Sequence, residues 1–99
     1  MKSTLTDISG IKKINFTPFV DSRGSLLKIY RREIYQDLLP VVEDIYLSQS
    51  NKNVIRGMHY QFGNKAQDKL VFCITGRMLD VSIDLRKDGN FGHVHVEEM

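Results

Sequence analysis

Residues 78–86 read MLDVSIDLR and show the clearest alternation of apolar and polar residues in the chain. Every second residue in it is apolar, namely Leu79, Val81, Ile83 and Leu85. Period-two alternation is typical of a half-buried β-strand, because successive side chains point to opposite faces of a sheet. We therefore predict a strand here, with the apolar face in the core and the other face polar.

Similar signals recur along the chain at short spacing. Strand-forming runs predict further strands over residues 14–19, 26–30, 41–48, 69–75 and 93–97. Turn compositions separate them, at residues 21–24, 50–53, 62–65 and 87–90. Short strands divided by turns favour an all-β fold, either an antiparallel β-sandwich or a jelly roll.

Two segments depart from this pattern. Residues 1–13 are polar and contain Gly10, which predicts a loosely held start before the first strand. Residues 32–39 carry apolar side chains at helical spacing and are followed by Pro40, so we predict one short helix that ends there.

The composition excludes several classes of protein. The chain has 99 residues, which suffices for one domain with a modest core. Hydrophobic residues make up 41% and charged residues 26%, with no apolar run long enough for a membrane span. The net charge of +2 comes without a basic block, so we expect no nucleic-acid partner. One cysteine and no secretory apolar region predict a cytoplasmic location.

Residues 54–61 read VIRGMHYQ and carry the most chemistry in the sequence. Arg56 and His59, with the later Lys69 and Asp80, could converge on a small anionic ligand. Gly57 lies inside this apolar-flanked run, where glycine often marks a bulge or a close backbone approach. On residue types alone, a packed or surface histidine is the commoner explanation of such a pattern.

Four blocks together resemble one family. They are DSRG at residues 21–24, RGMHYQ at 56–61, AQDKLV at 66–71, and Gly76 followed by DVSIDLR at 80–86. In order and spacing they are similar to the dTDP-4-dehydrorhamnose 3,5-epimerases, which are cupin enzymes of nucleotide-sugar biosynthesis. The resemblance spans roughly residues 16–92 and matches the N-terminal half of that family. It implies that residues 1–99 form a single, partial (truncated) cupin domain with a jelly-roll fold and one short helix.

The resemblance also implies a reaction and three catalytic residues. The substrate would be a nucleotide-linked 4-keto-6-deoxy sugar, used for surface polysaccharides, whose hydrogens next to the ketone are acidic. His59 would be the base, since imidazole titrates near neutral pH. Lys69 would stabilise the enolate oxygen, and Asp80 would orient Lys69 or His59. For Asp80, a solvated strand carboxylate is the alternative.

The resemblance further assigns substrate binding to Arg23, Arg56, Phe19 and Gln61. A guanidinium offers a planar fork of donors that suits a diphosphate. In the family the arginine at the position of Arg23 often reaches the neighbouring subunit's site, which implies a homodimer; otherwise Arg23 is a solvated turn residue. Family members usually carry Glu, Gln and Asn where this chain has Lys28, Asp44 and Tyr46, so the nucleotide base and the exact sugar stay open.

No metal or other cofactor is predicted. Many cupins bind a metal through His-x-His, but the second position after His59 is Gln61, a poor replacement for imidazole. His93, His95 and Glu97 alternate onto one face of a strand, and we interpret them as a polar edge rather than a ligand set.

Other functions stay open at this point. The family's proton-donating tyrosine lies in its C-terminal half and has no match here. A non-catalytic cupin that binds a nucleotide sugar or saccharide, or an inactive truncated epimerase fragment, are therefore alternatives to an active isomerase.

Overall fold

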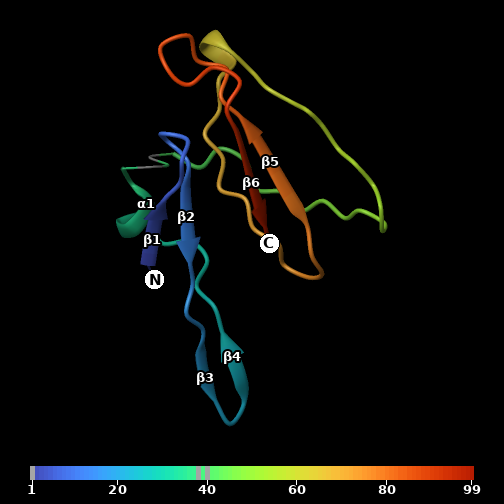
Figure 1. Ribbon diagram of the computed structural model, residues 1–99. Helices are drawn as coiled ribbons and strands as arrows, with labels where there is room; N and C mark the ends of the chain where they lie inside the picture. The colour runs from blue at the N-terminus through green and yellow to red at the C-terminus, as the bar shows by residue number, and fades with distance from the viewer. Residues whose placement is uncertain (1, 38, 40) are drawn as a thin grey trace. The chain divides into compact units, whose positions relative to one another are not determined.

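The computed structural model describes residues 2–37, 39 and 41–99. Its regular secondary structure is mostly short strands in small antiparallel sheets, with almost no helix, so the protein is all-β as predicted (Figure 1). Along the chain the elements are β1 (Lys2–Leu5), β2 (Lys12–Asn15), β3 (Phe19–Asp21), β4 (Gly24–Leu26), α1 (Arg32–Tyr35), the 3₁₀ helix η1 (Gly63–Lys65), β5 (Leu79–Ile83) and β6 (Val94–Glu98).

The strands form three antiparallel pairs, β1 with β2, β3 with β4, and β5 with β6. In these pairs Lys2 lies opposite Asn15, Phe19 opposite Leu26, and Leu79 opposite Glu98. The β3–β4 turn confirms the turn chemistry predicted for residues 21–24. Asp21 Oδ1 accepts the backbone N–H of Arg23 at 2.8 Å, and Gly24 has a φ of 130° that favours glycine.

The chain divides into two compact units. Unit 1 comprises Met1–Ile29 and Val71–Met99, and unit 2 is the intervening stretch Tyr30–Leu70. All the strands of the described residues belong to unit 1, whereas unit 2 holds α1, η1 and irregular backbone. Each unit has one buried hydrophobic side chain among the described residues, Ile8 in unit 1 and Tyr35 in unit 2.

The β5–β6 pair confirms the predicted alternation but reverses the predicted burial. The apolar face is the exposed one, with Leu79 63% and Val96 51% accessible. The polar side chains of the opposite face, among them Asp80 and His95, are less accessible. The reason is that the N-terminal segment of unit 1 contacts this face through polar partners. Our prediction that the apolar face is the core was therefore wrong for this chain.

Asp84 organises the connection from β5 to β6. Its side chain is 3% exposed and accepts hydrogen bonds from Arg86 Nε at 2.9 Å and Nη2 at 2.7 Å, and from the Arg86 backbone N–H at 3.0 Å. These bonds from Arg86 hold the pKa of Asp84 well below its usual range. Gly89 is required here, since a Cβ at that position would lie 2.9 Å from Asp84 Oδ2. The buried Asp84 carboxylate therefore stabilises this turn through its hydrogen bonds with Arg86.

Several predicted elements differ in the structure. Residues 41–48 and 69–75 form no strand, because neither segment pairs with a neighbour in the described part of the chain, and unpaired backbone makes no ladder. The strand predicted for residues 14–19 is split at Pro18, which has no N–H to donate, and the one predicted for 26–30 ends at Leu26.

The two ends of the chain show one wrong prediction and one correct one. The start is not loosely held, since β1 pairs with β2 along four residues. The last strand is confirmed as β6.

The short helix is confirmed as α1, while the positions of Leu38 and Pro40 lie outside the described residues. The helices of the described residues, α1 and η1, are too short to span a membrane.

Candidate functional site

Arg56 is the best-defined group of the predicted site. Its Nε donates to the Ser50 hydroxyl at 2.8 Å, and its Nη2 donates to the Gln49 carbonyl at 3.0 Å. A turn at Lys52–Asn53 makes this return possible: Asn53 has a φ of 65°, and the Val54 N–H donates to the Asn51 carbonyl at 3.3 Å. The guanidinium is thus fixed by neutral oxygens on an exposed loop of unit 2.

The residues after Arg56 form an extended loop rather than a strand. Gly57 has a φ of 125°, a conformation that favours glycine, so this position confirms the special backbone predicted from the sequence. His59, Gln61 and Lys69 are exposed, and within the described residues their side chains have no hydrogen bond or ion pair. The motif of unit 2 therefore exposes the His59 imidazole and the Lys69 ammonium to solvent, in addition to the Arg56 guanidinium.

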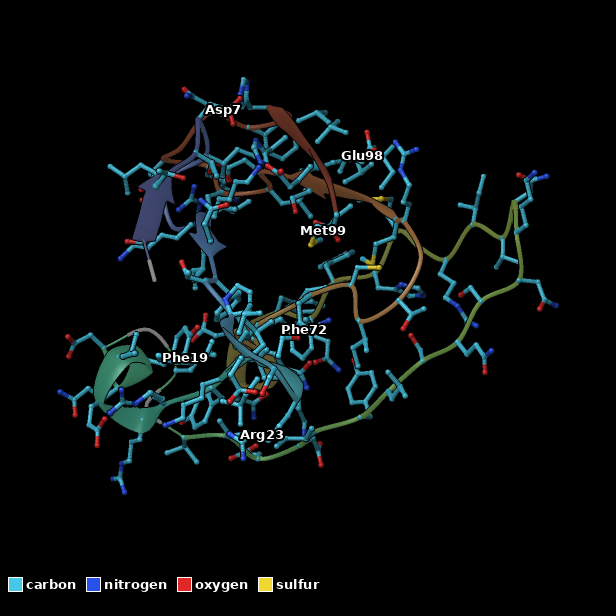
Figure 2. The ribbon with its side chains drawn as sticks, turned by 90° about the horizontal axis from the view of Figure 1, so that it is seen from below. Asp7, Phe19, Arg23, Phe72, Glu98 and Met99 are labelled. Carbon is cyan, nitrogen blue, oxygen red and sulfur yellow. The ribbon has the colours of Figure 1, made fainter. Side chains whose placement is uncertain are left out.

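Arg23 lies at the end of the β3–β4 hairpin in unit 1, as Figure 2 shows. Its Nη2 is 2.6 Å from Asp21 Oδ2, and its side chain is 88% exposed. The paired guanidinium lowers the pKa of the Asp21 carboxyl. A hollow of about 430 Å³ beside this hairpin is lined by Phe19, Asp21, Arg23, Gly24, Ser25 and Leu26.

The hollow brings two predicted substrate-binding residues together. Phe19 offers an exposed ring and Arg23 a guanidinium, on the same hairpin. Such a combination suits a planar group next to an anion. The Asp21 carboxylate, however, already occupies one edge of the Arg23 guanidinium. An anionic ligand would therefore use the other edge of Arg23 or displace Asp21.

Asp80 lies on β5, on the less accessible polar face. Its Oδ2 accepts a hydrogen bond from the Ser82 hydroxyl at 3.3 Å. Directly opposite on β6 is Glu97, another carboxylate.

The seven predicted site residues fall into two sets. Unit 1 carries Phe19, Arg23 and Asp80, and unit 2 carries Arg56, His59, Gln61 and Lys69. Within unit 1, the hollow joins Phe19 and Arg23 only. Within unit 2, Arg56, His59 and Gln61 lie on irregular backbone before η1, and Lys69 lies after it.

A second polar cluster, in unit 1, was only half visible in the sequence. Asp7 Oδ2 is 2.7 Å from His93 Nε2, and Asp7 Oδ1 is 2.6 Å from His95 Nδ1 (Figure 2 labels Asp7). Lys13 on β2 forms an ion pair with Glu97, which lies on β6 together with His95. The alternation of the two histidines was readable, but their partner lies 86 and 88 residues away in the chain.

This cluster satisfies its own polar groups. The hydrogen bond from His93, followed by that from His95, lowers the pKa of Asp7. No group of three metal-ligating side chains in the described residues is arranged to hold a metal ion. We name the contacts of Asp7 with His93 and His95 the Asp7 clasp.

Sequence reasoning missed Ser50 as well. It interpreted residues 50–53 only as a turn by composition, which the structure confirms, and gave the serine no function. A serine six residues before a site arginine is a weak signal in a single sequence. Only the loop geometry shows that the two side chains meet.

Comparison with known proteins identifies the family. The family model described as dTDP-4-dehydrorhamnose 3,5-epimerase matches residues 5–99. No solved structure gives a significant match.

Three curated relatives carry that same name. The chain is 40% identical over 74 residues to one from Salmonella typhimurium, 38% over 92 residues to one from Escherichia coli, and 34% over 88 residues to one from Methanothermobacter thermautotrophicus. These alignments cover 71%, 88% and 86% of this chain, but 40%, 49% and 46% of the relatives. The chain thus spans about half the length of the curated relatives it matches, and it belongs to the dTDP-4-dehydrorhamnose 3,5-epimerase family.

Proposed function

We propose that this protein acts as a nucleotide-sugar 3,5-epimerase, on a 4-keto-6-deoxy sugar linked to a nucleoside diphosphate. The observation that carries the proposal is the loop of unit 2, where a fixed Arg56 is followed by an exposed His59 within a motif of the family. The reaction requires a group that binds the diphosphate and a base that removes a proton next to the ketone. Arg56 is proposed for the first role and His59 for the second.

The first chemical step is removal of a proton next to the ketone. His59 takes the proton, and the electron pair left on carbon delocalises into the carbonyl as an enolate. Lys69 places an ammonium at the enolate oxygen, where a fixed charge is worth roughly a hundredfold or more in rate. Asp80 orients one of these groups. Return of a proton to the opposite face of the carbon completes the inversion and needs a separate acid.

Substrate binding falls to the remaining residues. Arg56 and Arg23 contact the diphosphate oxygens, Phe19 offers its ring to a planar group, and Gln61 supplies amide hydrogen bonds. The hollow beside β3–β4 supports this assignment for Phe19 and Arg23. The reaction draws on no cofactor or metal, since the base and the cation suffice for enolisation.

The same proposal covers fold, assembly and location. We infer a cupin jelly roll in a single, partial domain, to which the three antiparallel pairs contribute strands. We also infer a cytoplasmic homodimer, since unpaired strand edges are templates for association, and a role in surface-polysaccharide biosynthesis. Sedimentation at micromolar concentration tests the assembly: a dimer is expected, and a stable folded monomer would contradict it.

A binding protein without turnover is the second candidate. It is favoured by one observation: within the described residues no carboxylate contacts His59, so nothing there orients or activates the imidazole. In this case Arg56 would still hold a nucleoside diphosphate, but exchange of protons next to the ketone would be absent.

One experiment separates the two candidates. The chain is incubated with a nucleotide-linked 4-keto-6-deoxyhexose in heavy water, and deuterium at the carbons beside the ketone is followed by NMR. Exchange that is lost in His59→Ala supports the epimerase, with inversion if an acid is supplied and retained configuration if it is not. No exchange above buffer, with nucleotide still bound, would reject the enzyme and leave the binding protein.

A further inference from the structure

The Arg56 guanidinium uses only one of its two donor edges within the described protein. Nε and Nη2 form one edge of the planar group, and they donate to the Ser50 hydroxyl and the Gln49 carbonyl. A guanidinium has five N–H donors, so the outer edge, formed by Nη1 and the second N–H of Nη2, stays open. That outer edge has the geometry that binds two oxygen atoms of one phosphate or carboxylate group.

The partners of Arg56 differ from those of the other paired arginines. Four arginines of the described chain bind carboxylates instead, in the pairs Arg23–Asp21, Arg31–Glu33, Arg77–Glu98 and Arg86–Asp84. A carboxylate cancels the charge of a guanidinium, whereas a hydroxyl and a carbonyl orient it without cancelling its charge. Arg56 is therefore both fixed and still cationic, which is the combination that an anion-binding group needs.

We propose that Ser50 is a positioning residue, which holds Arg56 so that its outer edge faces the diphosphate of the ligand. The inference rests on the proposed function for the class of ligand, and adds a residue to it. Ser50 itself does not touch the ligand. Its hydroxyl removes rotamer freedom from Arg56 before binding, so the ligand does not have to order this long side chain.

The loop between the two residues makes this positioning possible. The left-handed Asn53 and the bond from the Val54 N–H to the Asn51 carbonyl reverse the chain, so that Arg56 returns to Ser50. Nearby Ser48 provides a matched control. It is also exposed, and its side chain makes no hydrogen bond within the described residues. The two serines thus differ in their contact with Arg56.

Calorimetric titration with dTDP and with UDP at low salt tests the role in binding. We expect Ser50→Ala to weaken binding about three- to tenfold, as is typical for the cost of ordering one long, flexible side chain on binding. Ser50→Thr, which keeps the hydroxyl, and Ser48→Ala should bind like the wild type. Equal affinity of Ser50→Ala and wild type, or no binding of either nucleotide by wild type, would overturn the proposal.

A double-mutant cycle shows whether Ser50 acts through Arg56. An Arg56→Lys variant keeps the positive charge, but it lacks the planar guanidinium that donates to both the Ser50 hydroxyl and the Gln49 carbonyl. We therefore expect Ser50→Ala to change the affinity less than about twofold there, because the two effects are coupled. An undiminished loss in this background would assign Ser50 a general structural role and overturn the proposal.

A measurement without ligand separates this inference from the proposed function. Hydrogen exchange of the Arg56 Nε–H, followed by ¹⁵N NMR, should be slower in wild type than in Ser50→Ala. Arg32, which has no side-chain hydrogen bond in the described residues, serves as an internal reference. Equal exchange would overturn the positioning role. Slow exchange and coupled binding without deuterium exchange of the sugar would support it, while rejecting only the epimerase.

Discussion

Charged side chains are held in different ways in unit 1 and in the motif of unit 2 that runs from Arg56 to Lys69. In unit 1 the charged side chains contact partners directly: Asp7 contacts two histidines in the Asp7 clasp, and Asp84 and Glu98 form ion pairs with Arg86 and Arg77. In the motif of unit 2, Arg56 is held by neutral oxygens, and His59 and Lys69 have no side-chain partner in the described residues. Paired charges maintain a fold, whereas a fixed but unneutralised charge can act on a ligand.

The largest expected effect comes from removing the unneutralised charge of unit 2. Arg56→Ala should weaken binding of dTDP or UDP by about ten- to a hundredfold, since hydrogen bonds to charged groups contribute about 1.5–3 kcal/mol. Wild-type binding should also weaken as salt is added. Calorimetry measures both effects. Arg77→Ala, which removes a paired arginine of unit 1, is the control and should bind normally; equal losses in both variants would end the distinction between the units.

The next effect tests whether the units are stabilised separately. Tyr35 is 1% exposed in unit 2, and Ile8 is 5% exposed in unit 1. Tyr35→Ala should lower the free energy of unfolding by about 3 kcal/mol, and Ile8→Ala by about 2 kcal/mol, because both leave cavities. Urea denaturation gives these values.

Amide hydrogen exchange shows where each variant is destabilised. Tyr35→Ala should speed exchange chiefly in residues 30–70, and Ile8→Ala chiefly in the strands of unit 1. Uniform acceleration throughout the chain in either variant would mean that the two units unfold as one.

A smaller, pH-dependent effect belongs to the Asp7 clasp. The folded-state pKa of Asp7 is lowered from its ordinary 3.8, so the clasp contributes stability above about pH 4 that is lost as the pH falls through the folded-state pKa. Asp7→Asn should therefore have a lower Tm than wild type at pH 6, with the difference shrinking below pH 4.

Asp68→Asn is the matched control for this titration. Asp68 is an exposed carboxylate of unit 2 without a side-chain partner in the described residues. It should leave the Tm unchanged across the same range. A Tm difference between wild type and Asp7→Asn that stayed constant down to pH 2 would show that ionisation of Asp7 is not what stabilises the contact.

The smallest effect is expected from an exposed ion pair. The side chains of Arg77 and Glu98 are 82% and 57% exposed, so solvent screens their attraction. Arg77→Ala should change the free energy of unfolding by less than about 0.5 kcal/mol. A loss above about 1 kcal/mol in urea denaturation would mean that charge pairing in unit 1 matters more than its exposure suggests.

The sequence predicted best where local chemistry is decisive. Alternation around Val81 predicted β5, and Asp21 with Gly24 predicted the β3–β4 turn, because side-chain period and turn preference act over a few residues. It failed for residues 41–48, which have the side-chain pattern of a strand but no partner in the described chain. A strand needs a neighbour, and a single strand's pattern does not say whether one is present.

The candidate site shows the same division. The family motif predicted Arg56, His59 and Lys69 as site residues from their order and spacing, and the match over residues 5–99 confirms the family. The contact of Arg56 with Ser50 and the Asp7 clasp were beyond prediction. Both depend on how the backbone returns on itself, which residue types do not encode directly.

Unit 2 interrupts the sequence of unit 1, and this connectivity has a consequence for synthesis on the ribosome. His93 is translated 86 residues after Asp7, which at about 5–20 residues per second takes roughly 4–20 seconds. Until then the Asp7 clasp and the β5–β6 pair are unavailable. The β3–β4 hairpin and the loop that joins Ser50 to Arg56 need only residues translated earlier. Cotranslational folding should therefore produce the loop that joins Ser50 to Arg56 before unit 1 is complete.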